Sequence, residues 1–298
     1  MKYQLITQLR AKKAYSIEQS CRVFEVSRSG YYGALQRQHQ PVKACLISTL
    51  LKSAFAASGG TYGSRRLKSA LVSQGHQIGR HRVRTLMRQH QLKPVWKPKF
   101  VATTNSKHDQ PVFDNVLNRQ FEVAKPNQAW VSDITYIRTH SGWLYLAVVL
   151  DLYARKVVGW AMAPTMPADL VCNALQMAIG QRQPEPGLIV HSDRGSQYAS
   201  EQYRRLLNRH ELIGSMSRKG NCWDNAVMER FFLNLKMERV WQRDYANHLE
   251  AVNDVTDYIV NFYNAKRLHS VLNYMSPNDF ERLPNTTKRQ PILVSEKT

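Results

Sequence analysis

The chain has 298 residues, of which 42 are Lys or Arg and 22 are Asp or Glu, so its formal net charge is +20. Hydrophobic residues make up 43% of the sequence, which is enough for a sizeable core and excludes a chain that is disordered throughout. The longest uninterrupted apolar run, from Trp143 to Leu150, is far shorter than the roughly 20 residues that cross a bilayer. We therefore expect a soluble cytoplasmic protein with no membrane partner.

Basic residues are concentrated in the first third of the chain. Residues 1–110 contain 20 Lys and Arg against 3 Asp and Glu, whereas residues 111–298 contain 22 against 19. Such a local excess of positive charge favours a polyanionic partner, and nucleic acid is the first candidate. We expect the N-terminal third to bind double-stranded DNA and the remainder to form a nearly neutral globular domain.

Residues 1–40 contain a pattern typical of a helix-turn-helix. The segment from Ser16 to Gln19 has the spacing of a capping box and predicts a short helix, and Ser27 can begin a second helix after a break at Val26. In a helix-turn-helix the second helix presents its first residues to the major groove, so Arg28 is a candidate DNA contact. An ordinary helical hairpin with a basic face would give the same pattern.

Residues 41–92 form a second predicted helical unit. Ser64 can cap a helix that Gly75 ends, and an amphipathic helix with an apolar face around Val83 and Leu86 follows. The second helix carries four arginines within nine residues, which would repel one another unless phosphate groups neutralised them, although a solvated basic face is the alternative. The candidate DNA-binding residues of this unit are Arg65, Arg66, Arg80, Arg82, Arg84 and Arg88.

Residues 93–122 are predicted to be a linker because they begin with prolines, lysines and small polar residues. A globular domain over residues 123–285 and a tail over 286–298 follow. The hydrophobic pattern of the domain predicts strands at 128–138, 142–151, 155–163, 188–191 and 212–216, and helices at 168–181, 200–210, 223–241 and 249–266. The order βββαβαβα with a final helix indicates an α/β fold built on one mixed sheet.

Three carboxylates occupy notable places in this order. Asp133 lies inside the first strand, Asp193 directly follows the fourth strand, and Glu229 lies in the long helix. A carboxylate in the middle of an apolar strand is costly to bury unless it is paired or metal-bound, so Asp133 calls for a partner. Asn225 lies one helical turn before Glu229, and Lys236 lies two turns after it.

The spacing of these carboxylates resembles the signature of the DDE transposases and retroviral integrases, which share an integrase core of the ribonuclease H-like superfamily. There are 35 positions between Asp193 and Glu229, and Lys236 follows the glutamate by seven. The chain is most similar to the insertion-sequence-three family of bacterial transposases, specifically to its second reading frame product. Further stretches that carry this resemblance are residues 62–92, 191–198 and 220–226, together with Tyr263, Asn264, Arg267, His269, Leu272, Tyr274 and Pro277.

The resemblance implies a ribonuclease H-like catalytic core over residues 123–285, preceded by an all-α helix-turn-helix DNA-binding region. It implies two Mg²⁺ ions, replaceable by Mn²⁺, held by Asp133, Asp193 and Glu229 as catalytic residues, with Asp133 shared between the ions. Lys236 is expected to contact DNA, and Asn225 is expected either to contact DNA or to orient Glu229.

The resemblance also implies what the protein does. We expect a transposase that binds the terminal inverted repeats of its insertion sequence and catalyses DNA strand cleavage and strand transfer into target DNA. The expected partners are DNA, further copies of the chain assembled on DNA, and a first-reading-frame product that acts separately or as an upstream fusion. Such a protein would be associated with the nucleoid.

Three other functions fit the sequence less well. A DNA-binding regulator would need the basic third but not all three carboxylates. A ribonuclease H acting on RNA–DNA hybrids would not need two helical DNA-binding units before its sheet. A retroviral integrase is expected to carry a His-His-Cys-Cys zinc domain, and the His and Cys residues here do not have that spacing.

Overall fold

The computed structural model describes residues 2–11, 15–39, 46–95, 111–218 and 221–283. The chain divides into two compact units, Met1–Ser53 and Ala54–Thr298. The middle of the predicted linker, residues 96–110, and the predicted tail at 286–298 lie outside the described residues. No helix in the described part of the chain is long and apolar enough to span a membrane.

The described residues of the first unit form α1 (Lys2–Ala11), α2 (Ile17–Val23) and α3 (Arg28–His39) before the chain enters the next helix. The predicted capping box of α2 is present, because Ser16 Oγ accepts from the backbone N–H of Gln19 and the Gln19 side chain accepts from the backbone N–H of Ser16. Ser27 Oγ accepts from the backbone N–H of Gly30 at 3.1 Å and so caps α3 as predicted. The helices share a small core around Ile6, Cys21 and Tyr31. Helix α1 was not anticipated from the sequence.

Helix α4 (Leu46–Ala57) contains the division between the units, and α5 (Ser64–Ser73) and α6 (Arg80–Gln89) follow it. Both predicted helices are confirmed, and Gly75 adopts a φ of +86° after the end of α5. The predicted cap of α5 is wrong by one residue. Gly63 is the cap because it has the extended backbone of that position, whereas Ser64 is already helical and accepts a hydrogen bond from Arg80 Nε at 3.4 Å.

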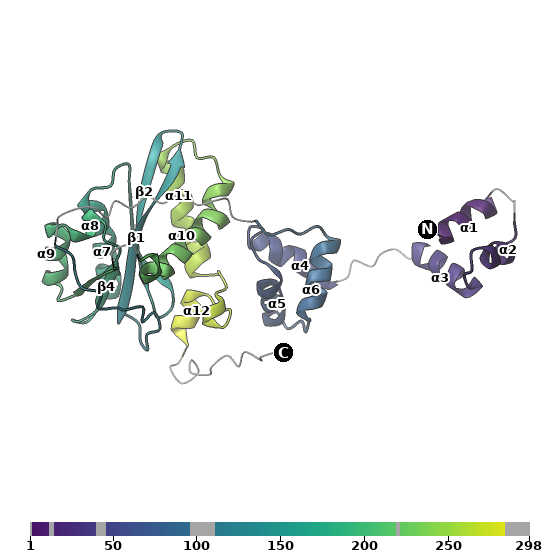
Figure 1. Cartoon of the computed structure of the whole chain (residues 1–298), viewed down its shortest axis with the longest axis horizontal. Coiled ribbons are helices and arrows are strands. Elements are labelled where there is room, and N and C mark those ends of the chain that lie inside the picture. Colours follow the sequence, from purple (N-terminus) through teal and green to yellow (C-terminus); the bar gives the residue numbers. More distant parts are fainter. Residues whose placement is uncertain (1, 12–14, 40–45, 96–110, 219–220, 284–298) are drawn as a thin grey trace. The chain divides into compact units, whose positions relative to one another are not determined.

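The rest of the second unit is built on one five-stranded mixed sheet (Figure 1). The strands are β1 (Ala129–Thr139), β2 (Gly142–Asp151), β3 (Lys156–Ala163), β4 (Ile189–Ser192) and β5 (Ile213–Met216). Their order across the sheet is β3-β2-β1-β4-β5. The first three strands form the predicted antiparallel meander, while β4 pairs parallel with β1, and β5 pairs parallel with β4. This confirms the α/β fold predicted from the sequence.

Helices cover both faces of this sheet, as Figure 1 shows for α7 and α9 on one side and α10 and α11 on the other. The helices are α7 (Ala168–Arg182), α8 (Ser196–Ala199), α9 (Glu201–Arg209), α10 (Ala226–Glu238), α11 (His248–Asp257) and α12 (Pro277–Arg282). Short helical turns are η1 (Cys222–Asn225), η2 (Val240–Gln242), η3 (Tyr258–Asn264) and η4 (Ser270–Leu272). Alternate residues of β1 face the two layers: Trp130 packs with Leu175 of α7, and Val131 packs with Leu235 of α10.

Part of the predicted linker belongs to the core. Leu117 is 2% exposed and packs in the same cluster as α10. The backbone N–H groups of Val116 and Leu117 donate to Ser215 Oγ at 3.0 and 3.1 Å. Residues 111–119 are therefore fastened to β5, and a linker over the whole of 93–122 does not describe this segment.

Candidate active site

The register of the sheet brings two of the predicted carboxylates to one end of neighbouring strands. Strands β1 and β4 run parallel, and Val131 pairs with His191. Asp133 and Asp193 each lie two residues beyond this pair, so both carboxylates come to the same end of the parallel strands. Asp193 follows the last residue of β4, and its Oδ1 accepts from the backbone N–H of Gly195 at 2.9 Å.

The third carboxylate is carried by α10. Phe231 and Leu235 of this helix share a core cluster with Val131. Residues two apart on a strand face the same side, so the helix packs on the face of β1 to which Asp133 also belongs. Glu229 lies in the first turn of α10 and is exposed.

Asn225 fastens the start of α10 to β1. Its Nδ2 donates to the backbone oxygen of Ser132 at 3.4 Å, next to Asp133 in the sequence. The Asn225 side chain is 5% exposed, and its Oδ1 is buried with no hydrogen-bond partner in the part of the chain that the structure describes. The sequence left DNA contact and orientation of Glu229 open as roles for Asn225, and the structure buries its side chain between β1 and the start of α10.

The pKa of Asp133 reflects the proximity of the other two carboxylates. Burial raises the pKa of Asp133 well above its usual value, and the negative charges of Asp193 and Glu229 raise it further. The backbone N–H of Ile134 and the ammonium of Lys236 act in the opposite direction. Asp133 is therefore close enough to Asp193 and to Glu229 for their negative charges to disfavour its ionised form.

This set of side chains suits a hard divalent cation such as Mg²⁺. It offers only oxygen ligands, and a cation would relieve the repulsion that raises the pKa of Asp133. Among the residues that the structure describes, no three His, Cys, Asp or Glu side chains converge closely enough to surround one ion by themselves. Mg²⁺ takes octahedral coordination and usually keeps several waters, so oxygens of water or a substrate would complete the coordination of a bound ion.

Lys236 lies beside the carboxylates. Its Nζ is 4.5 Å from the centroid of the Tyr136 ring. Burial lowers the pKa of Lys236, and the charge of Asp133 opposes that shift. The structure thus holds a cation over an aromatic face near the first carboxylate.

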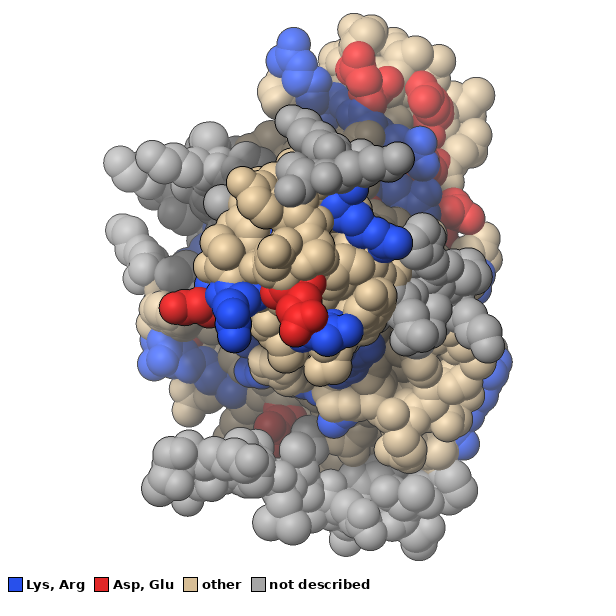
Figure 2. Space-filling model, turned by 90° about the vertical axis from the view of Figure 1, so that its right-hand side faces the viewer, with Lys and Arg blue, Asp and Glu red and all other residues tan. Residues whose placement is uncertain are grey.

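The predicted DNA-binding arginines of the helical region differ in their surroundings. Arg66 is 25% exposed, and its Nη1 lies 3.5 Å from Glu238 of α10, so it faces a carboxylate within its own unit. Arg28 lies 3.8 Å from Glu18 but remains 63% exposed. The exposed residues of this set are Arg28, Arg65, Arg80, Arg82, Arg84 and Arg88. Figure 2 shows Lys and Arg side chains at the surface of the molecule, together with Asp and Glu side chains.

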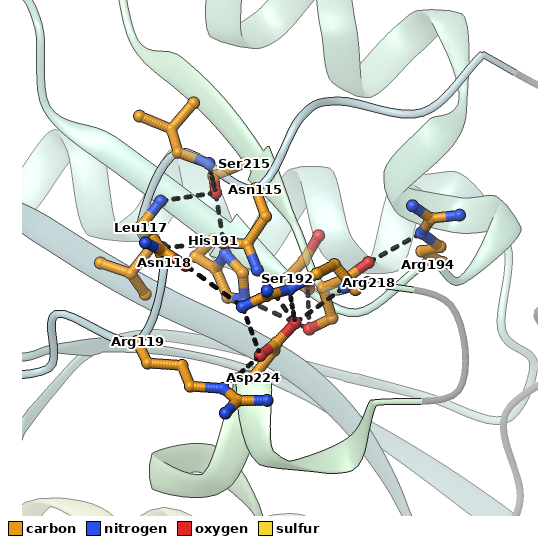
Figure 3. Close-up of polar contacts among 12 residues, drawn as sticks. Asn115, Leu117, Asn118, Arg119, His191, Ser192, Arg194, Ser215, Arg218 and Asp224 are labelled. Atoms are coloured by element: carbon orange, nitrogen blue, oxygen red, sulfur yellow. Dashed lines mark hydrogen bonds and ion pairs between the residues drawn. The ribbon is translucent and has the colours of Figure 1, made fainter.

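A polar cluster around Asp224 was not predicted from the sequence (Figure 3). Asp224 is fully buried, and its carboxylate accepts from Arg119 Nε at 2.7 Å and from the backbone N–H of Arg218 at 2.9 Å. Burial alone would raise the pKa of Asp224, but these hydrogen bonds and the guanidinium charges hold it well below its usual value. The sequence did contain one indication of this cluster, because residues 220–226 resemble the transposase family, but that resemblance assigned no role to Asp224.

Family models match both parts of the chain. An HTH-like domain matches residues 44–100, and integrase core domains match residues 123–222 and 212–277. Helical DNA-binding elements followed by this sheet define a DDE polynucleotidyl transferase with an integrase core of ribonuclease H-like fold.

Curated relatives identify the family. The chain is 42% identical over 286 residues to "Transposase InsF for insertion sequence IS3A" of Escherichia coli (strain K12), covering 94% of this chain and 98% of that protein. It is 44% identical over 262 residues to "Insertion element IS600 uncharacterized 31 kDa protein" of Shigella sonnei, covering 87% of this chain and 96% of that protein. The chain belongs to the IS3 family of insertion-sequence transposases.

Solved integrase structures are more distant. The catalytic core domain of HTLV-2 integrase, solved in complex with magnesium, matches with a TM-score of 0.41 at 16% sequence identity, covering 53% of this chain and 97% of that chain.

Proposed function

We propose that this transposase binds the terminal inverted repeats of its insertion sequence through residues 1–92 and that its core cleaves DNA strands and transfers them to target DNA. The single observation that carries the proposal is that Asp133 and Asp193 come to one end of the parallel strands β1 and β4, with Glu229 in the first turn of the helix that packs on the same face of β1. Membership of a transposase family supports the same reaction class.

The residues that would hold two Mg²⁺ ions, or Mn²⁺ in their place, are Asp133, Asp193 and Glu229. Such ions, when bound, supply an activated hydroxyl or water and neutralise the charge on the leaving oxygen of a phosphodiester. The remaining side chains of the site position the carboxylates and bind the DNA. Asn225 keeps the helix of Glu229 against β1, and Lys236 contacts a DNA phosphate next to Asp133.

DNA recognition is assigned to the exposed arginines of the helical region. Among the described residues, no buried carboxylate pairs with any of these arginines, in contrast to Arg66, which is paired with Glu238. Phosphate contacts give affinity and position, and the first residues of α3 and α6 would read bases. Joining two DNA ends requires more than one copy of the chain on DNA, and a first-reading-frame product would act with it as a separate protein or a fusion.

The test compares the carboxylate variants Asp133→Asn, Asp193→Asn and Glu229→Gln in the full chain. The substrate is a duplex copied from the DNA that flanks the coding region, with Mg²⁺ present. Each variant is expected to lose strand cleavage while binding the duplex as the unaltered protein does, because only the proposed ion ligands change.

The matched controls are Asp169→Asn and Glu201→Gln, which make the same substitutions at exposed positions on α7 and α9. Both are expected to cleave normally. A carboxylate variant that cuts as fast as these controls would remove its residue from the proposed site.

A further inference from the structure

The loop between β5 and α10 is fastened next to the carboxylates at both of its ends. At its start, the backbone N–H of Ser217 donates to the backbone oxygen of Ser192, the neighbour of Asp193 in the sequence, at 2.9 Å. At its end, Asn225 donates to the backbone oxygen of Ser132. Side chains near the two ends of this loop therefore lie close to the proposed catalytic site.

Asp224 belongs to this loop, and its buried carboxylate is shared by two arginines, Arg218 of the same loop and Arg119 from the segment before β1 (Figure 3). Arg119 Nε donates to Oδ1 at 2.7 Å, and Arg218 Nε donates to Oδ2 at 3.1 Å. The Asp224 side chain is 0% exposed, whereas those of Arg119 and Arg218 are 43% and 50% exposed. Asn115 Nδ2 also donates to Oδ2, at 2.9 Å. The cluster thus combines one buried negative charge with two positive charges that reach the surface.

Each arginine keeps donors that the carboxylate does not use. Within the described residues, the two Nη groups of Arg119 and the Nη1 group of Arg218 make no hydrogen bond. A guanidinium is planar and rigid, so a group that holds its Nε side leaves the opposite N–H groups available to a second partner. The second partner must be an acceptor, and the net positive charge favours an anion.

The backbone that delivers Arg119 is strained. Asn118 and Arg119 adopt φ values of +43° and +63° in succession, in the left-handed region that residues other than glycine rarely occupy. The turn is held by Asn115 Oδ1, which accepts from the backbone N–H of Asn118 at 2.8 Å, and by the bond from Arg119 to Asp224. Strain of this kind persists where the surrounding structure enforces it, and it is concentrated at functional sites.

We propose that Arg119 and Arg218, oriented by Asp224, form an arginine clamp for a backbone phosphate of the DNA strand that enters the catalytic site. The proposal rests on the proposed function, since it takes that strand to lie along the carboxylates. A phosphodiester carries one negative charge and two free oxygens, which match one net positive charge and the paired donors of the guanidiniums. Asp224 is a positioning residue, because it fixes the arginines without touching DNA.

The first test compares Arg119→Gln and Arg218→Gln with the control Arg205→Gln in the full chain. Arg205 is 76% exposed and, within the described residues, pairs with Glu201 alone on its own helix α9, so the control removes the same charge elsewhere on the core. With the flanking-DNA duplex as probe, each clamp variant is expected to cleave about tenfold more slowly or worse. The plot of log binding constant against log salt is expected to become shallower by about 0.9 for each lost phosphate contact.

The second test replaces single phosphates of the duplex by uncharged methylphosphonates. In the unaltered protein, one position near the cut is expected to reproduce the loss seen in the clamp variants, and the same replacement should then add little in Arg119→Gln. If Arg119 only stabilised the fold, the loss of cleavage caused by Arg119→Gln and the loss caused by each methylphosphonate would add at every position. Arg119→Lys restores the charge but lacks the planar donor fork, so it is expected to recover part of the salt dependence while cleavage stays slow, and full recovery of cleavage would reject the clamp.

The outcomes separate the clamp from the catalytic proposal. If Asp133→Asn abolishes cleavage while the clamp variants cut and bind like Arg205→Gln, the clamp alone is rejected. If the clamp variants change the salt dependence while Asp133→Asn still cuts, the clamp stands and the catalytic assignment fails.

Discussion

The buried ion pair between Glu238 and Arg267 carries a quantitative prediction about stability. Arg267 donates to the two carboxylate oxygens of Glu238 through Nε and Nη2, each at 2.7 Å, and the side chains are 1% and 6% exposed. The hydroxyl of Tyr258 donates to Glu238 Oε2 at 2.8 Å. Glu238→Gln preserves the shape of the side chain but leaves the guanidinium of Arg267 buried without its counter-charge.

The expected loss of stability in Glu238→Gln follows from the burial of both partners of the ion pair. Removing one partner of a buried ion pair costs about 3–5 kcal/mol, because the remaining charge stays desolvated. Arg66 lies 3.5 Å from the same carboxylate, so Glu238→Gln deprives two cations of one anion. For a chain of this size, 1 kcal/mol corresponds to about 2–4 °C in melting temperature, so we expect a decrease of about 6–20 °C.

The assay is thermal and urea unfolding followed by far-ultraviolet circular dichroism. The control is Glu201→Gln, which breaks a pair with Arg205 at 2.5 Å in which both side chains are 76% exposed. An exposed pair contributes about 0–1 kcal/mol, so the control is expected to change little. If Glu238→Gln and Glu201→Gln lower the free energy of unfolding equally, burial does not set the strength of this pair and the reasoning is wrong.

The strands could be predicted well because their signals are local. The predicted range 142–151 coincides with β2, and β1 and β3 begin one residue later than predicted. The alternation of buried and less buried residues from Thr135 to Thr139 and the tight turn at Gly142, whose φ is +113°, lie within a few residues of each other. The order of elements then restricts the sheet to few topologies.

Elements shaped by distant contacts could not be predicted. The expected helix at 249–266 is instead α11 followed by the π-helical turn η3 (Tyr258–Asn264). In that turn, Asn264 accepts from the backbone N–H of Val157 and donates to its backbone oxygen, and Val157 is more than a hundred positions away in the sequence. The periodic pattern of hydrophobic residues in the sequence does not reveal a hydrogen-bond partner so far along the chain.

The candidate site likewise contains some residues that could be predicted from the sequence and others that could not. Asp133, Asp193 and Glu229 could be selected together because a strand, a strand end and a helix supply them in an order that the family shares. The orientation of Arg66 and Asn225 could not be predicted, because helical spacing does not say which face meets another element. Asp224 was missed for a similar reason: two of its partners, Asn115 and Arg119, come from a segment predicted to be a linker.

Two further predictions concern tight packing and buried charge. A Cβ at Gly159 would lie 2.3 Å from the backbone oxygen of Ala174 in α7, so Gly159→Ala is expected to lower the free energy of unfolding by about 3 kcal/mol or more. Gly180→Ala, in the same helix with nothing within 4 Å, should be neutral or stabilising by up to about 1 kcal/mol in the same urea titration, and equal losses would refute the steric argument. The last prediction concerns His269, which is buried and accepts from Arg267 through Nε2 at 3.3 Å, so its imidazole is neutral in the fold. Its pKa is lowered well below the usual value by burial and then by the charges of Arg267, Arg66 and Arg155. The unfolded chain takes up a proton near pH 6.5 and the folded chain does not, so lowering the pH from about 7.5 to about 5.5 removes roughly 1.4 kcal/mol of stability through this residue. His269→Gln keeps an acceptor without a titrating group, and its stability should therefore fall less than that of the unaltered chain over this range; parallel pH profiles would show that His269 is protonated in the fold.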